Sequence, residues 1–256
     1  ALLHVGLPSL RILMPLGISF FTFQQIGFLV DAKRALERNE PLSYSFLEYA
    51  VFISFFPQLV AGPIVSHEEF IPSLREPALW QPDGRDTAER ITLFVIGLSK
   101  KVLIADVFGK AADWGYANYP ALQALALLLT GLAYSVQLYF DFSGYSDMAR
   151  GLGLLFRFRL PVNFDSPYKA ENVAELWKRW HMTLSRFLTK YVYYPLGGSR
   201  RGELLTCRNL FLVFLLSGLW HGANWTYIVW GAINGAACIL HRYGKRLWER
   251  LPRVLG

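Results

Sequence analysis

The sequence predicts an all-α protein built as a polytopic bundle of membrane-spanning helices. Hydrophobic residues make up 53% of the 256 positions and charged residues only 18%, which is too apolar and too poor in charge for a typical soluble domain of this length. Long runs with few or no charged residues support the same class, because a helix needs roughly 20 residues to cross the hydrocarbon core of a bilayer. These runs lie at 12–30, 46–65, 121–140 and 209–240.

Other segments refine this bundle. The segment 91–109 contains Lys100, Lys101 and Asp106, so we expect it to border the bundle interior or to lie partly at the membrane interface. The run 209–240 suits two short or broken helices better than one span. No repeat or low-complexity tract separates domains, so we expect one domain over 1–256. Because the chain starts without methionine or a signal peptide, we also expect it to be an internal fragment of a longer protein.

The net charge of +7 is distributed unevenly along the chain. Ten Lys or Arg residues lie within 157–208 and five more within 242–253, whereas 66–90 is rich in acidic residues. Cytoplasmic loops of membrane proteins carry an excess of Lys and Arg, so both basic segments are predicted to be cytoplasmic. This requires an even number of crossings between them. A basic chain could also bind nucleic acid, but the apolar runs favour the lipid bilayer, and we expect no nucleic-acid partner.

The basic loop at 157–208 is too long for a simple turn, and its centre has a helical pattern. Asn172 is followed three residues later by Glu175, which resembles a capping box that satisfies the first free amides of a helix. From there, apolar residues recur on one face with a helical period, and His181 lies on that face. We therefore expect an amphipathic helix around 172–192, at the cytoplasmic interface or packed into the bundle mouth.

Of the five histidines, two are candidates for chemistry. His4, His67 and His241 lie beside loops or ends, where we expect exposed side chains without a function. His181 and His221 lie in apolar surroundings, where an imidazole is expected to stay neutral and able to accept a proton. Such a base could remove the proton from a hydroxyl that attacks a carbonyl, which typically contributes about 100- to 10,000-fold in rate. A buried structural histidine, hydrogen-bonded to a neighbouring helix, explains the residues equally well.

The stretch SGLWHGANW surrounds His221 with small and polar residues. Its glycines would let backbone or substrate approach the ring, and Asn224 could orient a carbonyl or a ring nitrogen. Trp180 and Trp220 each directly precede a candidate histidine and could form the wall of a substrate-binding chamber. Tryptophan is also common at membrane interfaces, so the position alone has a second explanation.

Two aspartates follow the apolar run at 121–140 and could suggest metal or acid–base chemistry. We expect instead that Asp141, together with Ser143, caps the start of a helix, and that Asp147 pairs with a cation inside the bundle. No metal site is expected. The two cysteines, Cys207 and Cys238, have no metal or redox spacing and are expected to be ordinary thiols.

Three passages carry a family resemblance: LYFDFSGYSDMARGLGLLFRFRLPVNFDSPY, ELWKRWHMTLSRFLTKYVYYPLGGSRRG and NLFLVFLLSGLWHGANWTYIVWGAINGA. They resemble the membrane-bound O-acyltransferase (MBOAT) family, in particular its bacterial branch of alginate O-acetyltransferases and related proteins that acetylate polysaccharide or peptidoglycan. The resemblance covers nearly the whole chain, and the RWH and GLWHGA elements with their separation are specific. Arg157 and Lys190 depart from the family pattern, in which Gly and an acidic residue, respectively, are common. The resemblance also implies a fragment that lacks N-terminal and C-terminal helices.

The resemblance implies an O-acyltransferase that moves an acetyl group from a cytoplasmic thioester, such as acetyl-CoA, towards hydroxyls of an exported polysaccharide or cell-wall glycan. It implies a multi-pass protein of the bacterial inner membrane, a buried tunnel where donor and acceptor meet, and a periplasmic acetyl-transferring partner protein. No bound cofactor is expected. The catalytic histidine of the family corresponds to His221, which we assign as general base with His181 as its partner. Arg200 and Arg201 could bind the phosphates of CoA, although topology alone also explains basic residues there.

Two other classes of function remain open on the sequence. A membrane transporter is one, because intramembrane His, Asp and Lys also mark proton or substrate pathways. A non-catalytic scaffold of a polysaccharide export or modification complex is the other, and in a scaffold both candidate histidines would be dispensable.

Overall fold

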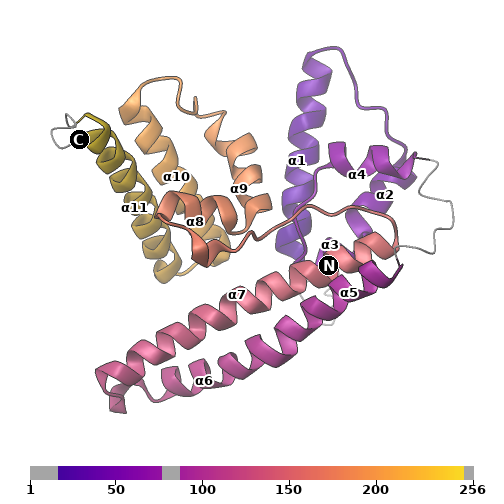
Figure 1. Cartoon of the computed structure of the whole chain (residues 1–256). Helices are drawn as coiled ribbons and strands as arrows, with labels where there is room; N and C mark the ends of the chain where they lie inside the picture. Colours follow the sequence, from indigo (N-terminus) through magenta and orange to yellow (C-terminus); the bar gives the residue numbers. More distant parts are fainter. Residues whose placement is uncertain (1–16, 77–86, 251–256) are drawn as a thin grey trace, which may run out of the picture.

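The computed structural model describes residues 17–76 and 87–250, and helices dominate both ranges (Figure 1). The all-α prediction is therefore confirmed for the described residues. The helices are α1 (Ile18–Glu37), α2 (Phe46–Ser54), α3 (Phe56–Leu59), α4 (His67–Leu74), α5 (Thr87–Ser99), α6 (Asp106–Ala117), α7 (Ala124–Leu155), α8 (Val173–Arg179), α9 (Met182–Leu188), α10 (Glu203–His221) and α11 (Trp225–Arg250). Short π-helical segments at Lys100–Ala105 and Thr189–Tyr193 follow α5 and α9.

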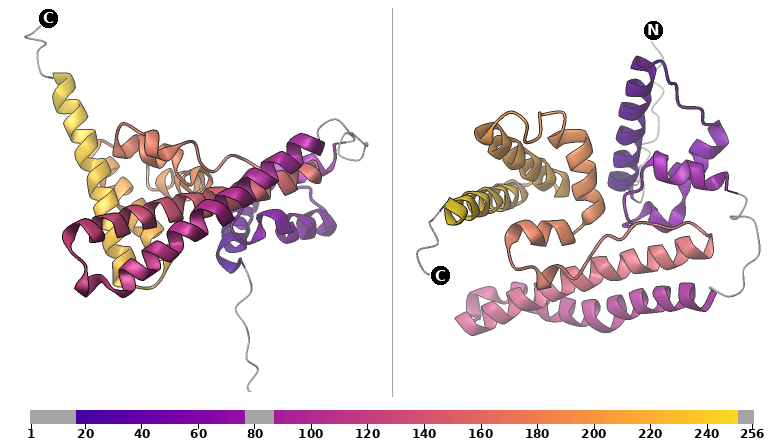
Figure 2. Two further views of the ribbon diagram at one scale, coloured as in Figure 1. Left: turned by 60° about the horizontal axis from the view of Figure 1, so that its bottom comes forward. Right: turned by 45° about the horizontal axis from the view of Figure 1, so that its top comes forward.

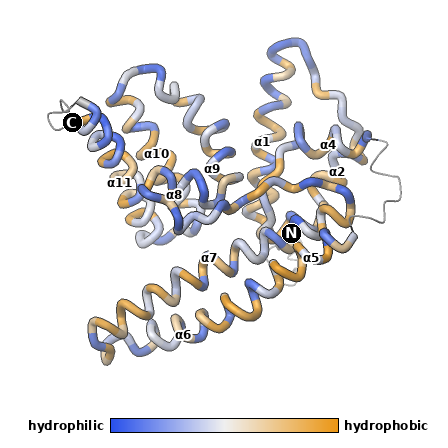
Figure 3. Tube along the Cα trace, in the orientation of Figure 1, coloured by the Kyte–Doolittle hydropathy of each residue, from blue (hydrophilic) through white to orange (hydrophobic). Residues whose placement is uncertain are grey.

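A long hairpin of α5, α6 and α7 forms one side of the molecule, and the two other groups of helices, α1–α4 and α8–α11, lie along it (Figures 1 and 2). The glycines of the hairpin allow close packing, since a Cβ added to Gly97 would lie only 2.5 Å from the carbonyl oxygen of Gly144. Apolar stretches recur along all three helices (Figure 3). In the described part of the chain, α7 and α10 are long and apolar enough to cross a membrane.

The charged residues of the hairpin pair across its interface. Lys100 lies 2.6 Å from Asp147, and Lys101 lies 2.7 Å from Asp141. The prediction that Asp147 pairs with a cation is confirmed. The prediction that Asp141 and Ser143 cap a helix start is wrong, because both lie well inside α7, where the neighbouring backbone amides already have helical partners.

The predicted spans differ from the observed helices in two places. The run 46–65 is interrupted after α2, because the chain is extended at Phe55 and Pro57 opens the separate short helix α3. The run 209–240 contains most of α10 and most of α11, as two helices broken at 222–224, which confirms the prediction made for it. The run 12–30 falls partly outside the described residues, and its remainder lies in α1.

The predicted helix around 172–192 starts as expected but is not continuous. The Asn172 side-chain oxygen accepts the backbone N–H of Glu175 at 2.9 Å, which confirms the predicted N-terminal cap. The helix then breaks between α8 and α9 at His181, which has left-handed backbone angles of φ 44° and ψ 53°. A right-handed helix cannot continue through such a residue. The break therefore corrects the prediction of one helix, and it also determines where His181 lies.

Apolar packing holds α9 between α1 and α10. Leu184, Phe187 and Leu188 are buried and pack with aromatic residues of the two neighbouring helices. Phe23 of α1 lies 4.6 Å from Phe187 and 5.2 Å from Trp220, measured between ring centroids. Full burial of each such side chain contributes about 1.5–3 kcal/mol, so this cluster fixes α9 firmly against the helix that ends at His221.

Candidate active site

A cavity of about 1080 Å³ lies between α8, α9, α10 and α11, and both candidate histidines, His181 and His221, contribute to its lining. Trp177, Trp180 and Trp230 form part of the aromatic wall. The fold thus brings together two segments that lie 40 positions apart in the sequence. The lining also includes five basic and three acidic side chains, namely Lys178, Arg179, Arg242, Lys245, Arg246, Asp165, Glu175 and Glu249.

His181 is buried, with 4% of its surface exposed. Phe142 packs edge-on against the imidazole at 4.7 Å between ring centroids. Burial lowers the pKa of His181 to about 3, and the nearby His221 contributes in the same direction. The ring is therefore neutral at physiological pH, as the sequence predicted for an imidazole in apolar surroundings.

Asn163 holds this imidazole, and sequence reasoning missed it. The Asn163 side-chain oxygen lies 3.1 Å from Nδ1 of His181 and also accepts the backbone N–H of Thr183 at 3.2 Å. Asn163 is 1% exposed and lies on the extended segment between α7 and α8. The stretch PVNFDSPY that contains it carries no helical or strand pattern, so only the tertiary contact reveals its role.

Trp220 lies close to both histidines. Its ring centroid lies 6.1 Å from that of His181 and 4.7 Å from that of His221. Nε1 of Trp220, Nε1 of Trp177 and Nε2 of His181 are buried and have no hydrogen-bond partner among the described residues. Buried polar atoms without a partner are rare in folded proteins, and three of them around one site point to a ligand or water that completes it.

His221 differs from His181 in its surroundings. It is the last residue of α10, and its side chain is exposed, although burial was expected. Its ring lies 5.3 Å from that of Trp230. Gly218, one turn earlier, allows α11 to approach, since an added Cβ would lie 2.2 Å from the carbonyl oxygen of Tyr227. The cavity thus contains one sequestered imidazole and one accessible imidazole.

The other residues selected from the sequence lie in different places. Trp180 lines the cavity and packs edge-on against Phe164 at 5.2 Å. Asn224 is exposed, and its side-chain oxygen accepts the backbone N–H of Thr226 at 3.0 Å, which is the contact of a cap for α11. Arg200 and Arg201 are exposed on the turn before α10, outside the cavity lining. The basic residues near the cavity come from α8 and α11 instead.

The expectation that His67 is exposed is wrong. His67 is 1% exposed in α4, where its Nε2 lies 3.3 Å from an Asp31 oxygen and its Nδ1 lies 3.2 Å from the Tyr44 hydroxyl. Lys190 contributes an ammonium group that lies 2.8 Å from both Asp31 and Glu68. Together with Tyr191, which donates to Asp31, these residues join α1, α4 and the π-helical segment that follows α9.

The charges in this network stabilise one another. Burial disfavours ionisation of Asp31, but hydrogen bonds from Lys190 and Tyr191 outweigh it, so the pKa of Asp31 lies below its usual value. Burial likewise disfavours charged Lys190, but its bonds to Asp31 and Glu68 prevail, and its pKa is raised. Burial and the bond to Asp31 raise the pKa of Tyr191 to about 12.

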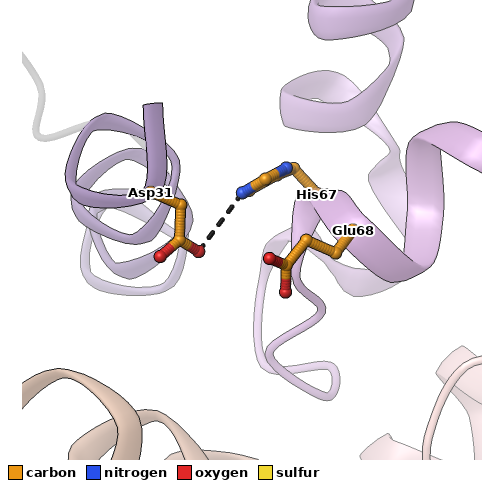
Figure 4. Close-up of side chains that lie close together, drawn as sticks. All are labelled: Asp31, His67 and Glu68. Carbon is orange, nitrogen blue, oxygen red and sulfur yellow. Dashed lines mark hydrogen bonds and ion pairs between the residues drawn. The ribbon is translucent and has the colours of Figure 1, made fainter. Parts of the chain in front are cut away.

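The same network contains three groups that could in principle bind a metal ion. Ligand atoms of Asp31, His67 and Glu68 lie within 4.8 Å of one another (Figure 4). The Lys190 ammonium lies 2.8 Å from both carboxylates, which is where a cation shared by them would bind. Because a fixed positive charge already neutralises this pair and would repel a second one, the residues present do not fit a metal ion.

The fold and the site together define a class of protein: an all-helical protein, with two helices long and apolar enough to cross a membrane, whose cavity presents two histidines of different accessibility. Comparison with known sequences specifies it further. The chain belongs to the membrane-bound O-acyltransferase family, whose sequence pattern matches residues 9–252. Members of this family are membrane-bound, in agreement with the two apolar helices of membrane-spanning length.

Individual relatives cover almost all of this chain. A peptidoglycan O-acetyltransferase of Helicobacter pylori is 48% identical over 97% of the chain, and a protein named probable alginate O-acetylase AlgI of Pseudomonas aeruginosa is 42% identical over 96%. A teichoic acid D-alanyltransferase of Bacillus subtilis is 29% identical over 95%. The chain spans about half the length of the first two relatives, 52% and 44%, and 62% of the third.

Proposed function

We propose that this chain carries the acyl-transfer site of an integral-membrane O-acetyltransferase. The donor is a cytoplasmic thioester, acetyl-CoA, and the acceptor is a hydroxyl of an exported polysaccharide or cell-wall glycan. Membership of the MBOAT family supports the reaction class. The relatives named for O-acetylation of peptidoglycan and alginate support an acceptor of this kind.

The observation that carries the proposal is the composition of the large cavity along α10. His221 ends this helix, whereas Arg242 and Arg246 pair with Glu203 at its start, at 2.5 and 2.6 Å. A helix of 19 residues is about 28 Å long, so the basic residues and the histidine lie near opposite ends of the cavity. An acyl thioester with a phosphate-bearing tail is an elongated ligand with one anionic end and one reactive end, which matches this arrangement.

In the reaction that we propose, the acceptor hydroxyl attacks the thioester carbonyl while His221 takes its proton. The tetrahedral intermediate then expels the thiolate, which recovers the proton from the histidinium. The exposure of His221 in the cavity supports this assignment, because a general base must reach its substrate and return to its neutral state. His181 acts as its partner and orients a substrate.

The phosphates of the donor bind near the basic side chains of α11 in this proposal, with Lys245 as the least constrained of them. The side chain of Lys245 is 67% exposed and its contact with Glu249 is long, at 3.9 Å. Arg200 and Arg201 remain the alternative donor site. Both groups belong to the basic segments that the positive-inside rule assigns to the cytoplasm, so we propose a multi-pass protein of the bacterial inner membrane with a tunnel to the donor side. A periplasmic partner protein completes delivery to the polymer.

Transfer of radiolabelled acetyl from acetyl-CoA, measured with the protein in proteoliposomes, tests this function. We expect His221→Ala to lower the rate by about 100- to 10,000-fold, the contribution of a positioned acid–base group. Normal membrane insertion of the variant is the control. Full activity of His221→Ala would contradict the assignment of His221 as general base. Flux of an unmodified solute would indicate a transporter. If the native protein shows neither acetyl transfer nor solute flux, a non-catalytic scaffold is the remaining explanation.

A comparison of two double variants tests where the donor binds. We expect Lys245→Ala combined with Lys178→Ala to raise KM for acetyl-CoA, because each removes a positive charge from the cavity lining. The Arg200→Ala, Arg201→Ala double variant removes the same charge from the exposed turn. If only the latter pair raises KM, the donor binds at the turn and not at the cavity mouth.

A further inference from the structure

We propose that Asn163 is a positioning residue that fixes one tautomer of His181, so that Nε2 of His181 accepts a hydrogen bond from a hydroxyl group of the acyl acceptor. The identity of the ligand rests on the proposed function. The tautomer follows from the contacts of Asn163 alone, so the two parts can fail separately.

The orientation of the Asn163 amide is determined by Thr183. The backbone N–H of Thr183 can only donate, so the atom that lies 3.2 Å from it must be the side-chain oxygen of Asn163 and not the nitrogen. The hydroxyl of Thr183 donates to the same oxygen at 2.9 Å, while it accepts the backbone N–H of Ile64 at 3.0 Å. The amide nitrogen then faces the hydroxyl of Ser146 at 3.4 Å.

This orientation determines the protonation of His181. The Asn163 oxygen has no hydrogen to give, so Nδ1 of His181, 3.1 Å away, must be the nitrogen that carries the proton. A neutral imidazole has only one N–H, and burial keeps this ring neutral, as its lowered pKa shows. Nε2 is consequently an unprotonated nitrogen with a free lone pair.

The backbone supports the same arrangement. The backbone N–H of Met182 donates to the carbonyl oxygen of Asn163 at 2.9 Å, and the N–H of Asp165 donates to the carbonyl oxygen of Arg179 at 3.0 Å. These bonds tie the segment of Asn163 to both sides of the helix break, where His181 has its left-handed backbone. Such a conformation costs a non-glycine residue about 1–2 kcal/mol, and these contacts offset it.

The free nitrogen indicates what kind of group binds there. Nε2 is buried and has no partner among the described residues, so its ligand must bring a hydrogen-bond donor. The thioester group itself has no N–H or O–H, and the amide N–H groups of a CoA arm lie several bonds away from it, whereas the glycan hydroxyl that attacks this carbonyl brings an O–H and has further hydroxyls beside it. With a pKa of about 3, His181 is a weak base that holds a hydroxyl without removing its proton. His221 is left to deprotonate the hydroxyl that attacks.

The tautomer can be measured directly. Nitrogen-15 NMR of histidine-labelled protein in lipid vesicles distinguishes Nδ1–H, Nε2–H and doubly protonated rings, and the His181→Gln variant assigns the signal. We expect a neutral Nδ1–H ring that persists down to pH 5. Thr183→Val should leave it unchanged, because this variant removes the hydroxyl but keeps the His181–Asn163 bond, whereas Asn163→Leu should release the tautomer. An Nε2–H or doubly protonated ring in the native protein would overturn the proposal.

Asn163→Asp gives a second variant in case Asn163→Leu fails to fold. The carboxylate keeps an acceptor for Nδ1 and for Thr183, but its charge favours the imidazolium form. We therefore expect both ring nitrogens of His181 to carry protons at neutral pH, with a loss of acceptor binding. A His181 ring that stays neutral in the Asn163→Asp variant would show that Asn163 does not control the state of His181.

The hydroxyl ligand is tested by two substitutions of His181. In His181→Gln the amide oxygen can take the place of Nε2 as an acceptor, whereas His181→Leu has none. We expect His181→Leu to raise KM for a short unacetylated alginate or peptidoglycan oligosaccharide by roughly 5- to 150-fold, the effect of losing one buried hydrogen bond, with KM for acetyl-CoA unchanged. His181→Gln should retain most of the acceptor binding. Equal loss of kcat in both variants would mean that His181 is a base instead.

A binding measurement separates this inference from the proposed function. Addition of the same oligosaccharide should shift the Nε2 signal of His181 even in a His221→Ala protein that transfers nothing. A shift with acetyl-CoA alone, and none with the oligosaccharide, would assign Nε2 to the donor and refute the acceptor site.

Discussion

Replacement of Lys190 by methionine should destabilise the protein far more than loss of an ordinary surface lysine. The Lys190 ammonium lies 2.8 Å from both Asp31 and Glu68, and Asp31 is only 7% exposed. Removal of one partner of a buried ion pair costs about 3–5 kcal/mol, because the other charge is left without compensation. The Lys190 side chain is 34% exposed and Asp31 keeps its bond from Tyr191, so we discount this to about 2–3 kcal/mol.

The measurement is thermal unfolding of the protein in detergent at pH 7. A loss of about 2–3 kcal/mol lowers the midpoint by about 4–12 °C in a protein of this size. Lys33→Met is the matched control, since the Lys33 side chain is 80% exposed and its contact with Glu37 is 3.8 Å. We expect the control to change stability by less than about 0.5 kcal/mol. Equal midpoints for the Lys190 and Lys33 variants would refute the reasoning.

A double-mutant cycle with Asp31→Asn isolates the pair. Once Asp31 has no charge, loss of the Lys190 ammonium leaves only the more exposed Glu68 without its partner, so we expect the double variant to be more stable than the sum of the single losses by about 1–2 kcal/mol. Additive losses would show that the two charges do not interact between α1 and the segment that follows α9.

The pH dependence of the Lys190 effect has a definite sign. The pKa of Asp31 is lowered by folding, so its contribution is present above the unfolded value of about 3.9 and is lost as the pH falls through the folded value. The pKa of Lys190 is raised, so its contribution is present below about 10.4 and is lost as the pH rises through the folded value. We therefore expect a constant difference between native and Lys190→Met protein from pH 5 to 9, which shrinks in acid. A difference that peaks near pH 6.5 would instead implicate a histidine.

Three smaller perturbations test the local geometry, each by the shift of the same unfolding midpoint. Gly218→Ala places a Cβ 2.2 Å from the carbonyl oxygen of Tyr227 and should lower stability by about 1–3 kcal/mol. Gly244→Ala is the control, because its Cβ would meet nothing within 4 Å, and it should be neutral or stabilising by up to about 1 kcal/mol. Asn172→Ala removes the cap of α8 and should cost about 1 kcal/mol; no loss would argue that the Glu175 amide finds another partner. Arg157 has a left-handed backbone with φ 65°, which Gly adopts easily and Val does not. We therefore expect Arg157→Gly to change stability by less than about 1 kcal/mol and Arg157→Val to lower it by about 1–2 kcal/mol. A Gly variant less stable than the Val variant would exclude backbone strain at this position.

Features that depend on neighbouring residues could be predicted from the sequence. The cap at Asn172 and the break within 209–240 were predicted because a side-chain oxygen three residues from an amide, or an uncharged run too long for one span, is visible locally. The family resemblance led us to expect Gly at position 157, and that expectation has a physical explanation, since the backbone of Arg157 is left-handed.

Features that depend on distant contacts could not be predicted. The apolar period around 172–192 continues through His181, so the sequence indicated one helix, but bonds from Asn163 outweigh helical propensity at that point. His67 was expected to be exposed because it lies beside a loop. Its burial depends on a contact with Asp31, which lies 36 positions earlier in the sequence. Local patterns do not report such pairs, and both corrections have the same cause.

The two breaks in the helices explain why the site has its histidines at helix ends. The start of a helix leaves backbone N–H groups without helical partners, and a side-chain oxygen can satisfy them. At each break an asparagine does this: Asn163 accepts the N–H of Thr183 at the start of α9, and Asn224 accepts the N–H of Thr226 at the start of α11. Only the first asparagine also reaches an imidazole. This difference accounts for one histidine that is fixed in a single protonation state and another that stays free to exchange a proton.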